Sequence, residues 1–420
     1  MDAPARNDVE CGGISPPGYD GIQTAMTSDS AVIPRPTPSS ERIDAIDVLR
    51  GIALFGVMAI NIVMEFRVSI FDQFLGPRML ASPVDRAIEA ILTQAVELKA
   101  FALFSLLFGA GLAIQFDRLA TSERRTVLLV RRLAVLLVFG IIHLCLIWNG
   151  DILTEYALAG FIVLPLLFGP RWLLTLAALV SLALYLAMQA FPPAGLFPSR
   201  AAIWQDVMDA NRIYATGGFL DVLAFRFREI PLIASLHAFV FLRTIGLFLV
   251  GALAWRSGIL QNVRALFAIA IPAIGLGAAL LYRGSEPLGT ILLALGYGAG
   301  ILGIAHFERG KKLLGWAAPL GRMAFTNYVA QSIIFGWIFY GYGLGLFGRL
   351  GITPALAIGI IVYAGQLRFS KWWLRHYRYG PLEWLWRSLM YGVRQPMVLA
   401  EMALRTQLSS RTSEAQIRDP

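Results

Sequence analysis

Long apolar runs alternate with short polar segments along most of this 420-residue chain. The runs are continuous rather than alternating in polarity, which is typical of helices and not of the strands of a membrane barrel. Several reach the length of about 20 residues that a helix needs to cross a bilayer. The pattern predicts an all-α fold: a polytopic transmembrane helical bundle within residues 42–370, with about ten spans at 45–63, 99–117, 127–147, 152–168, 172–190, 233–255, 263–282, 287–307, 318–340 and 352–369.

The segments outside these runs are more polar. Residues 1–41 are rich in Pro, Ser, Asp and Gly, so we expect a disordered cytoplasmic tail. We expect 64–98 and 191–232 to be extracytoplasmic segments. Tryptophan, tyrosine and arginine interleave over 371–395, which is typical of an amphipathic helix at the lipid interface. Residues 396–420 are expected to form a flexible tail.

Composition agrees with a membrane protein. The chain is 57% hydrophobic and 15% charged, whereas a soluble globular protein is about a quarter charged. Its net charge is +9, but the basic residues lie between apolar runs, which indicates contact with anionic lipid headgroups rather than nucleic acid. Lysine and arginine concentrate in alternate short loops and in the C-terminal tail, so the positive-inside rule predicts that both termini are cytoplasmic. The two cysteines, Cys11 and Cys145, suggest neither a disulfide framework nor a metal site.

Polar residues interrupt the first apolar run in a regular way. Arg50 and Asn61 are eleven residues apart and therefore share a helical face, with Asp47 beside them. Polar groups in lipid are costly unless they face protein or water. We therefore expect this face to line an interior site.

The third run repeats the spacing. Arg132 and His143 are also eleven residues apart, and a neutral imidazole there is either a general base or a histidine hydrogen-bonded inside the bundle. Asp151 opens the next run, where an acid is typical of a helix N-cap. Glu155, four residues on, shares a helical face with Asp151, so the two carboxylates are candidates to orient His143 or to bind a cation.

Two further runs contain polar side chains. His237 and Arg243 lie in the sixth run, and a buried arginine needs an acidic partner, a polar network or an anionic ligand. Arg322, Asn327 and Gln331 lie in the ninth run. The amides either bind substrate or join helices by hydrogen bonds.

Four motifs together resemble a known family. They are IDVLRGIALFGVMAINI, LFSLLFGAGLAIQFDR, RRLAVLLVFGIIHLCLIWNGDILTEYALAG and GRMAFTNYVAQSIIFGWIF. As a set they resemble the domain-of-unknown-function 418 (DUF418) family, the YeiB-like bacterial inner-membrane proteins, over about residues 42–395. The first motif is also similar to that of heparan-alpha-glucosaminide N-acetyltransferase and the wider transmembrane acyltransferase superfamily.

The resemblance implies a location and an activity. The location is the bacterial cytoplasmic (inner) membrane, with multiple passes. The activity is the transfer of an acyl group from a cytoplasmic acyl-CoA to an extracytoplasmic hydroxyl or amine acceptor. Asp47, Arg50 and Asn61 match the first-helix pattern of the superfamily.

One feature of the superfamily is missing. The related acetyltransferases place a functional histidine shortly after the first helix, whereas this chain has Glu65 and Arg67 in that region. The resemblance therefore implies that a catalytic base would have to be His143 or His237.

These observations lead to a mechanistic hypothesis. His143, oriented by Asp151 or Glu155, takes a proton from the acceptor, and Asn61 donates a hydrogen bond to the developing oxyanion. Arginines near the cytoplasmic face attract the phosphates of the donor. The predicted substrate-binding residues are Asp47, Arg50, Arg132, His237, Arg243, Arg322, Asn327 and Gln331.

Two other functions remain open. In a transporter of a small anion or a lipid-linked solute, the polar face would line a permeation path with Arg243 as counter-ion. In a non-catalytic membrane scaffold, the polar groups would only hold helices together. For the enzyme, we expect acetyl-CoA or another acyl-CoA as donor, a small-molecule, glycan or lipid acceptor, membrane lipids as partners, and no covalently bound cofactor, metal ion or nucleic acid.

Overall fold

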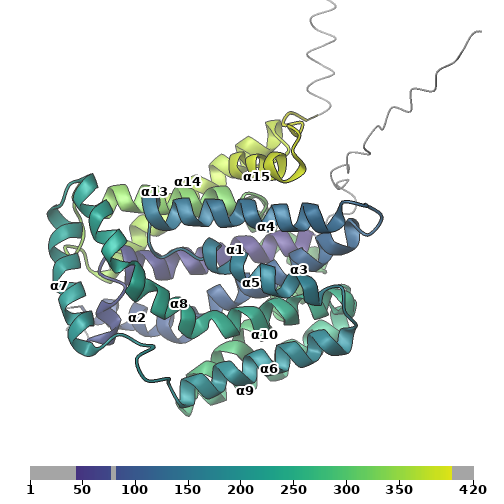
Figure 1. Ribbon diagram of the computed structural model, residues 1–420, viewed down its shortest axis with the longest axis horizontal. Helices are drawn as coiled ribbons and strands as arrows, with labels where there is room; N and C mark the ends of the chain where they lie inside the picture. The colour runs from purple at the N-terminus through teal and green to yellow at the C-terminus, as the bar shows by residue number, and fades with distance from the viewer. Residues whose placement is uncertain (1–43, 77–81, 400–420) are drawn as a thin grey trace, which may run out of the picture. The chain divides into compact units, whose positions relative to one another are not determined.

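The computed structural model describes residues 44–76 and 82–399 (Figure 1). Within these ranges the regular structure is helical, apart from an isolated bridge between Tyr377 and Val398. The predicted all-α helical bundle is confirmed. The expected tail at 1–41 and most of the one at 396–420 lie outside the described residues.

The helices follow the apolar runs. They are α1 (Asp44–Ile60), α2 (Pro83–Ala95), α3 (Lys99–Arg118), α4 (Arg125–Ile142), α5 (Leu153–Leu166), α6 (Arg171–Ala190), α7 (Arg200–Thr216), α8 (Phe219–Arg256), α9 (Val263–Tyr282), α10 (Glu286–Ala305), α11 (Glu308–Leu314), α12 (Ala318–Arg322), α13 (Ala324–Phe339), α14 (Ile352–His376) and α15 (Pro381–Tyr391). Two π-helical segments, η2 (Asn61–Phe66) and η4 (His143–Ile147), extend α1 and α4.

Eight helical segments of the described chain are long and apolar enough to cross a membrane, which indicates a multi-pass membrane protein. Two of the ten predicted spans differ from this set. The span at 152–168 is the 14-residue helix α5, and the span at 318–340 is divided into α12 and α13 at Met323. Met323 has φ −114° and ψ 30°, outside the helical region, so the two helices do not form one continuous rod.

Two predicted boundaries need correction. α14 continues to His376, so the segment 371–395 is the end of that helix followed by the separate helix α15, not one interfacial helix. The segment 191–232 contains α7 and the beginning of α8.

α8 is a single helix of 38 residues, about 57 Å long at ~1.5 Å per residue, so it is longer than a bilayer core is thick. α7 lies across one end of the long helices, beside the first turns of α8 (Figure 1).

Glycines bring two pairs of helices together at backbone distance. A Cβ atom at Gly109 of α3 would overlap the carbonyl oxygen of Phe248 in α8, and one at Gly251 of α8 would overlap that of Leu106 in α3. A Cβ atom at Gly321 of α12 would likewise overlap a backbone carbonyl of α1. Small residues at such crossings are typical of membrane helix packing. They hold α3 against α8, and α12 against α1.

Two acidic side chains cap helices that lie far away in sequence. Asp85 of α2 accepts hydrogen bonds from the backbone N–H groups of Ile352 (3.2 Å) and Thr353 (2.9 Å) at the start of α14. Glu383 of α15 accepts from the N–H groups of Phe325 (2.8 Å) and Thr326 (3.0 Å) at the start of α13. The first N–H groups of a helix have no partner inside it, so these carboxylates satisfy them.

Replacing Glu383 by alanine is expected to lower the free energy of unfolding by about 1–2 kcal/mol, because the first turn of α13 loses its cap. Thr326 also loses the bond from its hydroxyl to this carboxylate (2.5 Å). Thermal unfolding in detergent measures the change, and Glu383→Gln, which keeps an acceptor oxygen, should lose less. Glu308→Ala is the control, because Glu308 is exposed and its ion pair is with Lys311, a neighbour in the same helix. A wild-type Tm for Glu383→Ala would contradict the capping role.

Candidate functional site

His143 is the centre of a buried chain of polar groups drawn from three parts of the fold. Its side chain is 1% exposed. Nε2 lies 2.9 Å from Oγ of Ser332 in α13, and Nδ1 lies 3.0 Å from Oδ1 of Asp151. Hydroxyl, imidazole and carboxylate therefore follow one another in the order found in acyl-transfer triads.

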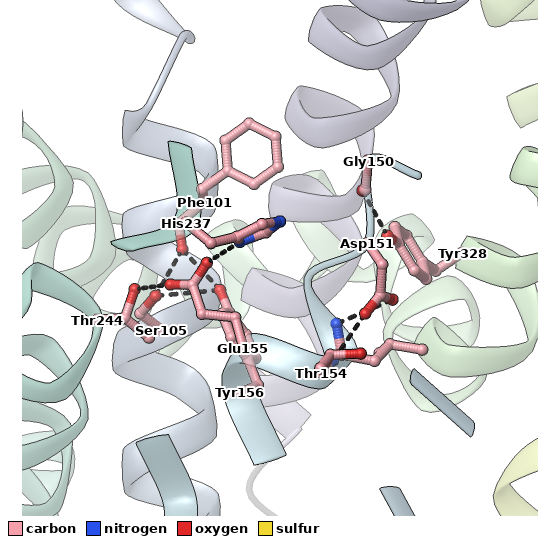
Figure 2. A network of polar contacts seen from close by, with 11 residues as sticks. Phe101, Ser105, Gly150, Asp151, Thr154, Glu155, Tyr156, His237, Thr244 and Tyr328 are labelled. Atoms are coloured by element: carbon pink, nitrogen blue, oxygen red, sulfur yellow. Dashed lines mark hydrogen bonds and ion pairs between the residues drawn. The ribbon is translucent and has the colours of Figure 1, made fainter. Parts of the chain in front are cut away.

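Asp151 has two structural tasks. Its carboxylate accepts hydrogen bonds from the N–H groups of Leu153 (3.1 Å) and Thr154 (2.7 Å), so it caps α5 (Figure 2). The same carboxylate contacts His143. The two roles that the sequence left open, helix cap and partner of the histidine, are thus compatible.

Glu155 pairs with a different histidine from the one expected. Its Oε2 lies 2.6 Å from Nδ1 of His237 in α8, and its Oε1 accepts a hydrogen bond from Thr244 (Figure 2). The reason is local: α5 begins only at Leu153, so Asp151 precedes the helix and does not share a helical face with Glu155. Of the two predicted carboxylates, only Asp151 lies beside His143.

Both residues around which the predicted site was built begin a π-helical segment. Asn61 is the first residue of η2, and His143 is the first of η4. Such segments are rare and occur frequently at functional sites. The ring of Phe66, at the end of η2, stacks on that of Trp148, just after η4, with centroids 4.4 Å apart. The end of η2 therefore packs against the residue that follows η4.

Asn61 itself is 4% exposed, and its Oδ1 makes no hydrogen bond with the described residues. The polar partners given by the structure for His143 are Ser332 and Asp151. A contact between Asn61 and the reacting groups at His143 therefore stays a prediction.

Arg132, one of the predicted donor-binding arginines, packs against an aromatic residue of α15. Arg50 pairs with Asp47 at 3.1 Å. The guanidinium carbon of Arg132 lies 4.3 Å from the ring centre of Trp386, whose indole N–H donates to the carbonyl of Arg132 (2.9 Å). The positive charges of Arg50 and Arg387 both act on Arg132. Arg387 is an addition to the predicted set, which did not consider α15 as part of this basic cluster.

The amides of the ninth predicted span hydrogen-bond to α14. The side-chain nitrogen of Asn327 donates to Ser370 (3.0 Å), and that of Gln331 donates to Gln366 (2.8 Å). These contacts favour the joining of helices over substrate binding for both residues.

The two remaining predicted arginines lie in α8 and α12. Arg243 is 3% exposed, its Nε and Nη1 make no hydrogen bond with the described residues, and its guanidinium carbon is 5.9 Å from the ring centre of Tyr185. Arg322 ends α12 next to the crossing with α1.

Ser332 is the functional candidate that sequence reasoning missed. It follows Gln331 in an apolar helix and is 189 positions from His143, so no spacing rule connects them. A serine inside an apolar span is an ordinary packing residue on sequence grounds. Only the folded arrangement of α13 against η4 reveals the pair.

A second buried network begins in the loop that contains Asp151. Glu229 of α8 is 1% exposed and accepts hydrogen bonds from Asn149 (2.6 Å) and from the Tyr214 hydroxyl. Asp206 of α7 hydrogen-bonds to Glu229, and burial raises the pKa of Asp206 to about 6. Among the described residues, no group of three or more His, Cys, Asp or Glu side chains is placed to hold a metal ion.

The raised pKa of Asp206 predicts a pH dependence of stability. The ordinary pKa is 3.8, so between pH 3.8 and about 6 the folded chain keeps a proton that the unfolded chain has lost. This contribution is fully present below pH 3.8 and is lost as the pH rises to about 6. Asp206→Asn is therefore expected to raise Tm at pH 7.5 and to have less effect at pH 4.5.

Thermal unfolding of the wild type and of Asp206→Asn at both pH values measures this difference. Glu123→Gln is the control, because Glu123 is exposed. Equal Tm differences between wild type and Asp206→Asn at the two pH values would show that Asp206 titrates normally.

Comparisons with known proteins give two relatives that match most of the chain. It is 35% identical over 397 residues to the uncharacterized protein YxaH of Bacillus subtilis (strain 168), covering 86% of this chain and 98% of that protein. It is 31% identical over 398 residues to the uncharacterized protein YeiB of Escherichia coli (strain K12), covering 85% and 98%. No solved structure gives a significant match. The family described as "Protein of unknown function (DUF418)" matches residues 247–393, a segment that includes Ser332. Together with the two full-length relatives, this match shows that the chain belongs to the DUF418 family.

Proposed function

We propose that this protein transfers an acyl group from an acyl-CoA to a hydroxyl or amine acceptor on the opposite side of the membrane. The observation that supports it is the chain of contacts from Ser332 through His143 to Asp151. A neutral imidazole takes a proton from a nucleophile, and a carboxylate at Nδ1 fixes its tautomer and stabilises the imidazolium that forms. This order of hydroxyl, imidazole and carboxylate is the one that acyl transfer uses. A histidine that only joined helices would not need it.

Burial favours transfer over hydrolysis. His143 and Asp151 are each 1% exposed, and Ser332 is 2% exposed. A site that excludes water protects a reactive acyl group until the acceptor arrives. Asn61, on the neighbouring π-helical segment, is proposed to donate a hydrogen bond to the developing oxyanion, a role worth about 3 kcal/mol in known sites.

Arg50 and Arg132 are proposed to bind the phosphates of the donor. Nε of Arg132 is buried and makes no hydrogen bond with the described residues, so a donor group is left for an anion. Guanidinium groups suit phosphate because they offer several N–H donors in one plane. The positive-inside rule predicts that the loop before α4 is cytoplasmic, which supports this role because acyl-CoA is found on that side.

The experiment that tests this function uses the purified protein in lipid nanodiscs. Acetyl-CoA labelled in its acetyl group is added with an extract of bacterial lipids and glycans as acceptors. The proposal predicts release of CoA thiol together with transfer of label into the extract. Failure of the folded wild type to release CoA above the rate of a heat-inactivated sample would contradict it.

The buried position of Arg243 favours a second function, transport. Among the described residues it has no carboxylate within ion-pair distance, although its side chain is buried in a helix long enough to cross the membrane. Such a cation would serve a transporter as counter-ion for a small anion or a lipid-linked solute. Uptake of an anion into proteoliposomes without any acyl donor, lost in Arg243→Gln, would support this alternative.

A further inference from the structure

We propose that Ser332 is a nucleophile, which carries the acyl group as a serine ester between donor and acceptor. The proposal rests on the proposed acyl transfer and adds a covalent intermediate to it. Its basis is the position of the Ser332 hydroxyl between His143 and the backbone of α13.

The hydroxyl is held where a base can remove its proton. Oγ of Ser332 lies 2.9 Å from Nε2 of His143 and 3.3 Å from the carbonyl oxygen of Tyr328. Oδ1 of Asp151 lies 3.0 Å from Nδ1 without hydrogen-bond geometry, and the charge of this nearby carboxylate favours the tautomer in which Nδ1 bears the proton. Nε2 is then the acceptor, and the serine hydroxyl donates to it. A weak nucleophile is activated in this way, by a base that a third group orients.

The other buried serines of the described chain, Ser69, Ser105 and Ser370, have different partners, and Ser69 accepts from the N–H group of Phe71. Ser105 contacts the hydroxyl of Tyr156 (3.0 Å) and donates to the carbonyl of Phe101. Ser370 accepts from Asn327. Among the described residues, Ser332 is the serine whose hydroxyl the structure places against an imidazole. Ser105 therefore offers a matched control: buried and hydrogen-bonded, but with no base beside it.

The proposed reaction balances without a further reagent. Oγ of Ser332 attacks the thioester carbonyl carbon while its proton passes to Nε2 of His143. The C–S bond then breaks, and the leaving sulfur takes that proton, which releases CoA thiol and leaves an ester on Ser332. An acceptor O–H or N–H next attacks the ester carbonyl and gives its proton to His143. The bond from the carbonyl carbon to Oγ breaks, and the serine recovers the proton.

Aromatic side chains cover the site in this structure. The rings of Tyr328 and Trp148 lie against the imidazole, with centroids 5.1 and 6.2 Å away. Since Ser332 and His143 are both nearly inaccessible, the donor must reach them after a local opening. We expect that opening to involve η4, which follows the last turn of α4 and leads directly into the Trp148 loop.

A small fluorophosphonate tests the nucleophile without any acyl-CoA, because it reacts with activated serines. The full-length protein in nanodiscs is treated with the reagent, and the labelled peptide is identified by mass spectrometry. We expect label on Ser332 in the wild type and in Ser105→Ala, and at least about 100-fold slower labelling in His143→Gln. Acetyl transfer by Ser332→Ala should fall by at least about 100-fold. The Tm of each variant separates loss of reactivity from loss of folding.

The outcomes separate this proposal from the proposed function. Labelling of Ser332 that depends on His143 supports the proposal that Ser332 is a nucleophile. If Ser332 is not labelled and a folded Ser332→Ala variant still transfers acetyl groups, Ser332 is not the nucleophile. The acyltransferase function then stands, with His143 acting directly on the acceptor. Without labelling and without CoA release by the wild type, both are overturned.

Discussion

Replacing His143 by alanine is expected to lower the rate of CoA-dependent acyl transfer by about 10²–10⁴-fold, the usual contribution of a general base. The expectation follows from the position of the imidazole between Ser332 and Asp151. Without it, Ser332 loses the base that the structure places beside its hydroxyl, and Asp151 keeps its role as the cap of α5. Initial rates of CoA thiol release at saturating acetyl-CoA measure the effect.

His306→Ala is the matched control for this substitution. His306 follows α10, and its Nδ1 lies 2.7 Å from the carbonyl oxygen of Leu302, within the same turn. It should leave the rate unchanged. Since removal of a buried imidazole also weakens packing, the Tm of His143→Ala must be measured alongside the rate. A folded His143→Ala variant with wild-type activity would remove His143 from the mechanism.

Replacing Gly109 by valine is expected to destabilise the fold by about 3 kcal/mol or more, the upper part of the range for overpacking. Even the first carbon of the new side chain would overlap the backbone of α8 at Phe248, and backbone cannot rotate away as a side chain can. α3 and α8 would have to separate, which disturbs Ser105 and Glu155 with their partners. The yield and Tm of the protein after size-exclusion chromatography in detergent report the effect.

Gly275→Val is the control for crowding. Gly275 lies in α9 with nothing within 4 Å of a Cβ atom placed there, so the same side chain finds open space. It should leave yield and Tm close to those of the wild type. If Gly109→Val were as stable as Gly275→Val, the close approach of α3 to α8 would be wrong.

The sequence predicted the helices well because long apolar runs have few alternatives in a membrane protein. It did not reveal that α8 begins at Phe219, because Asp221, Arg226 and Arg228 gave only a mixed helical pattern before the span predicted at 233–255. In the fold, Arg226 and Glu229 are each 1% exposed, and Glu229 has partners from α7 and from the loop after η4. Tertiary contacts of this kind cannot be inferred from the composition of one segment.

The site was only partly predictable for a related reason. His143 and Asp151 are close in sequence, so an apolar run followed by an N-cap was enough to bring them together. Ser332 and His237 reach their partners across the bundle, and helical periodicity on one span says nothing about which neighbouring span it faces. Of the two carboxylates predicted to orient His143, the structure places Asp151 beside it, whereas Glu155 on α5 pairs with His237.

The most direct test of acyl chemistry at this site is the pre-steady-state release of CoA thiol after acetyl-CoA is mixed with the purified wild type. If Ser332 accepts the acyl group, CoA appears in a rapid burst proportional to the amount of protein, before any acceptor is added, and the burst is absent in His143→Ala. If the folded wild type, supplied with both donor and acceptors, releases CoA no faster than His143→Ala does, the contacts among Ser332, His143 and Asp151 hold helices together and do not transfer acyl groups.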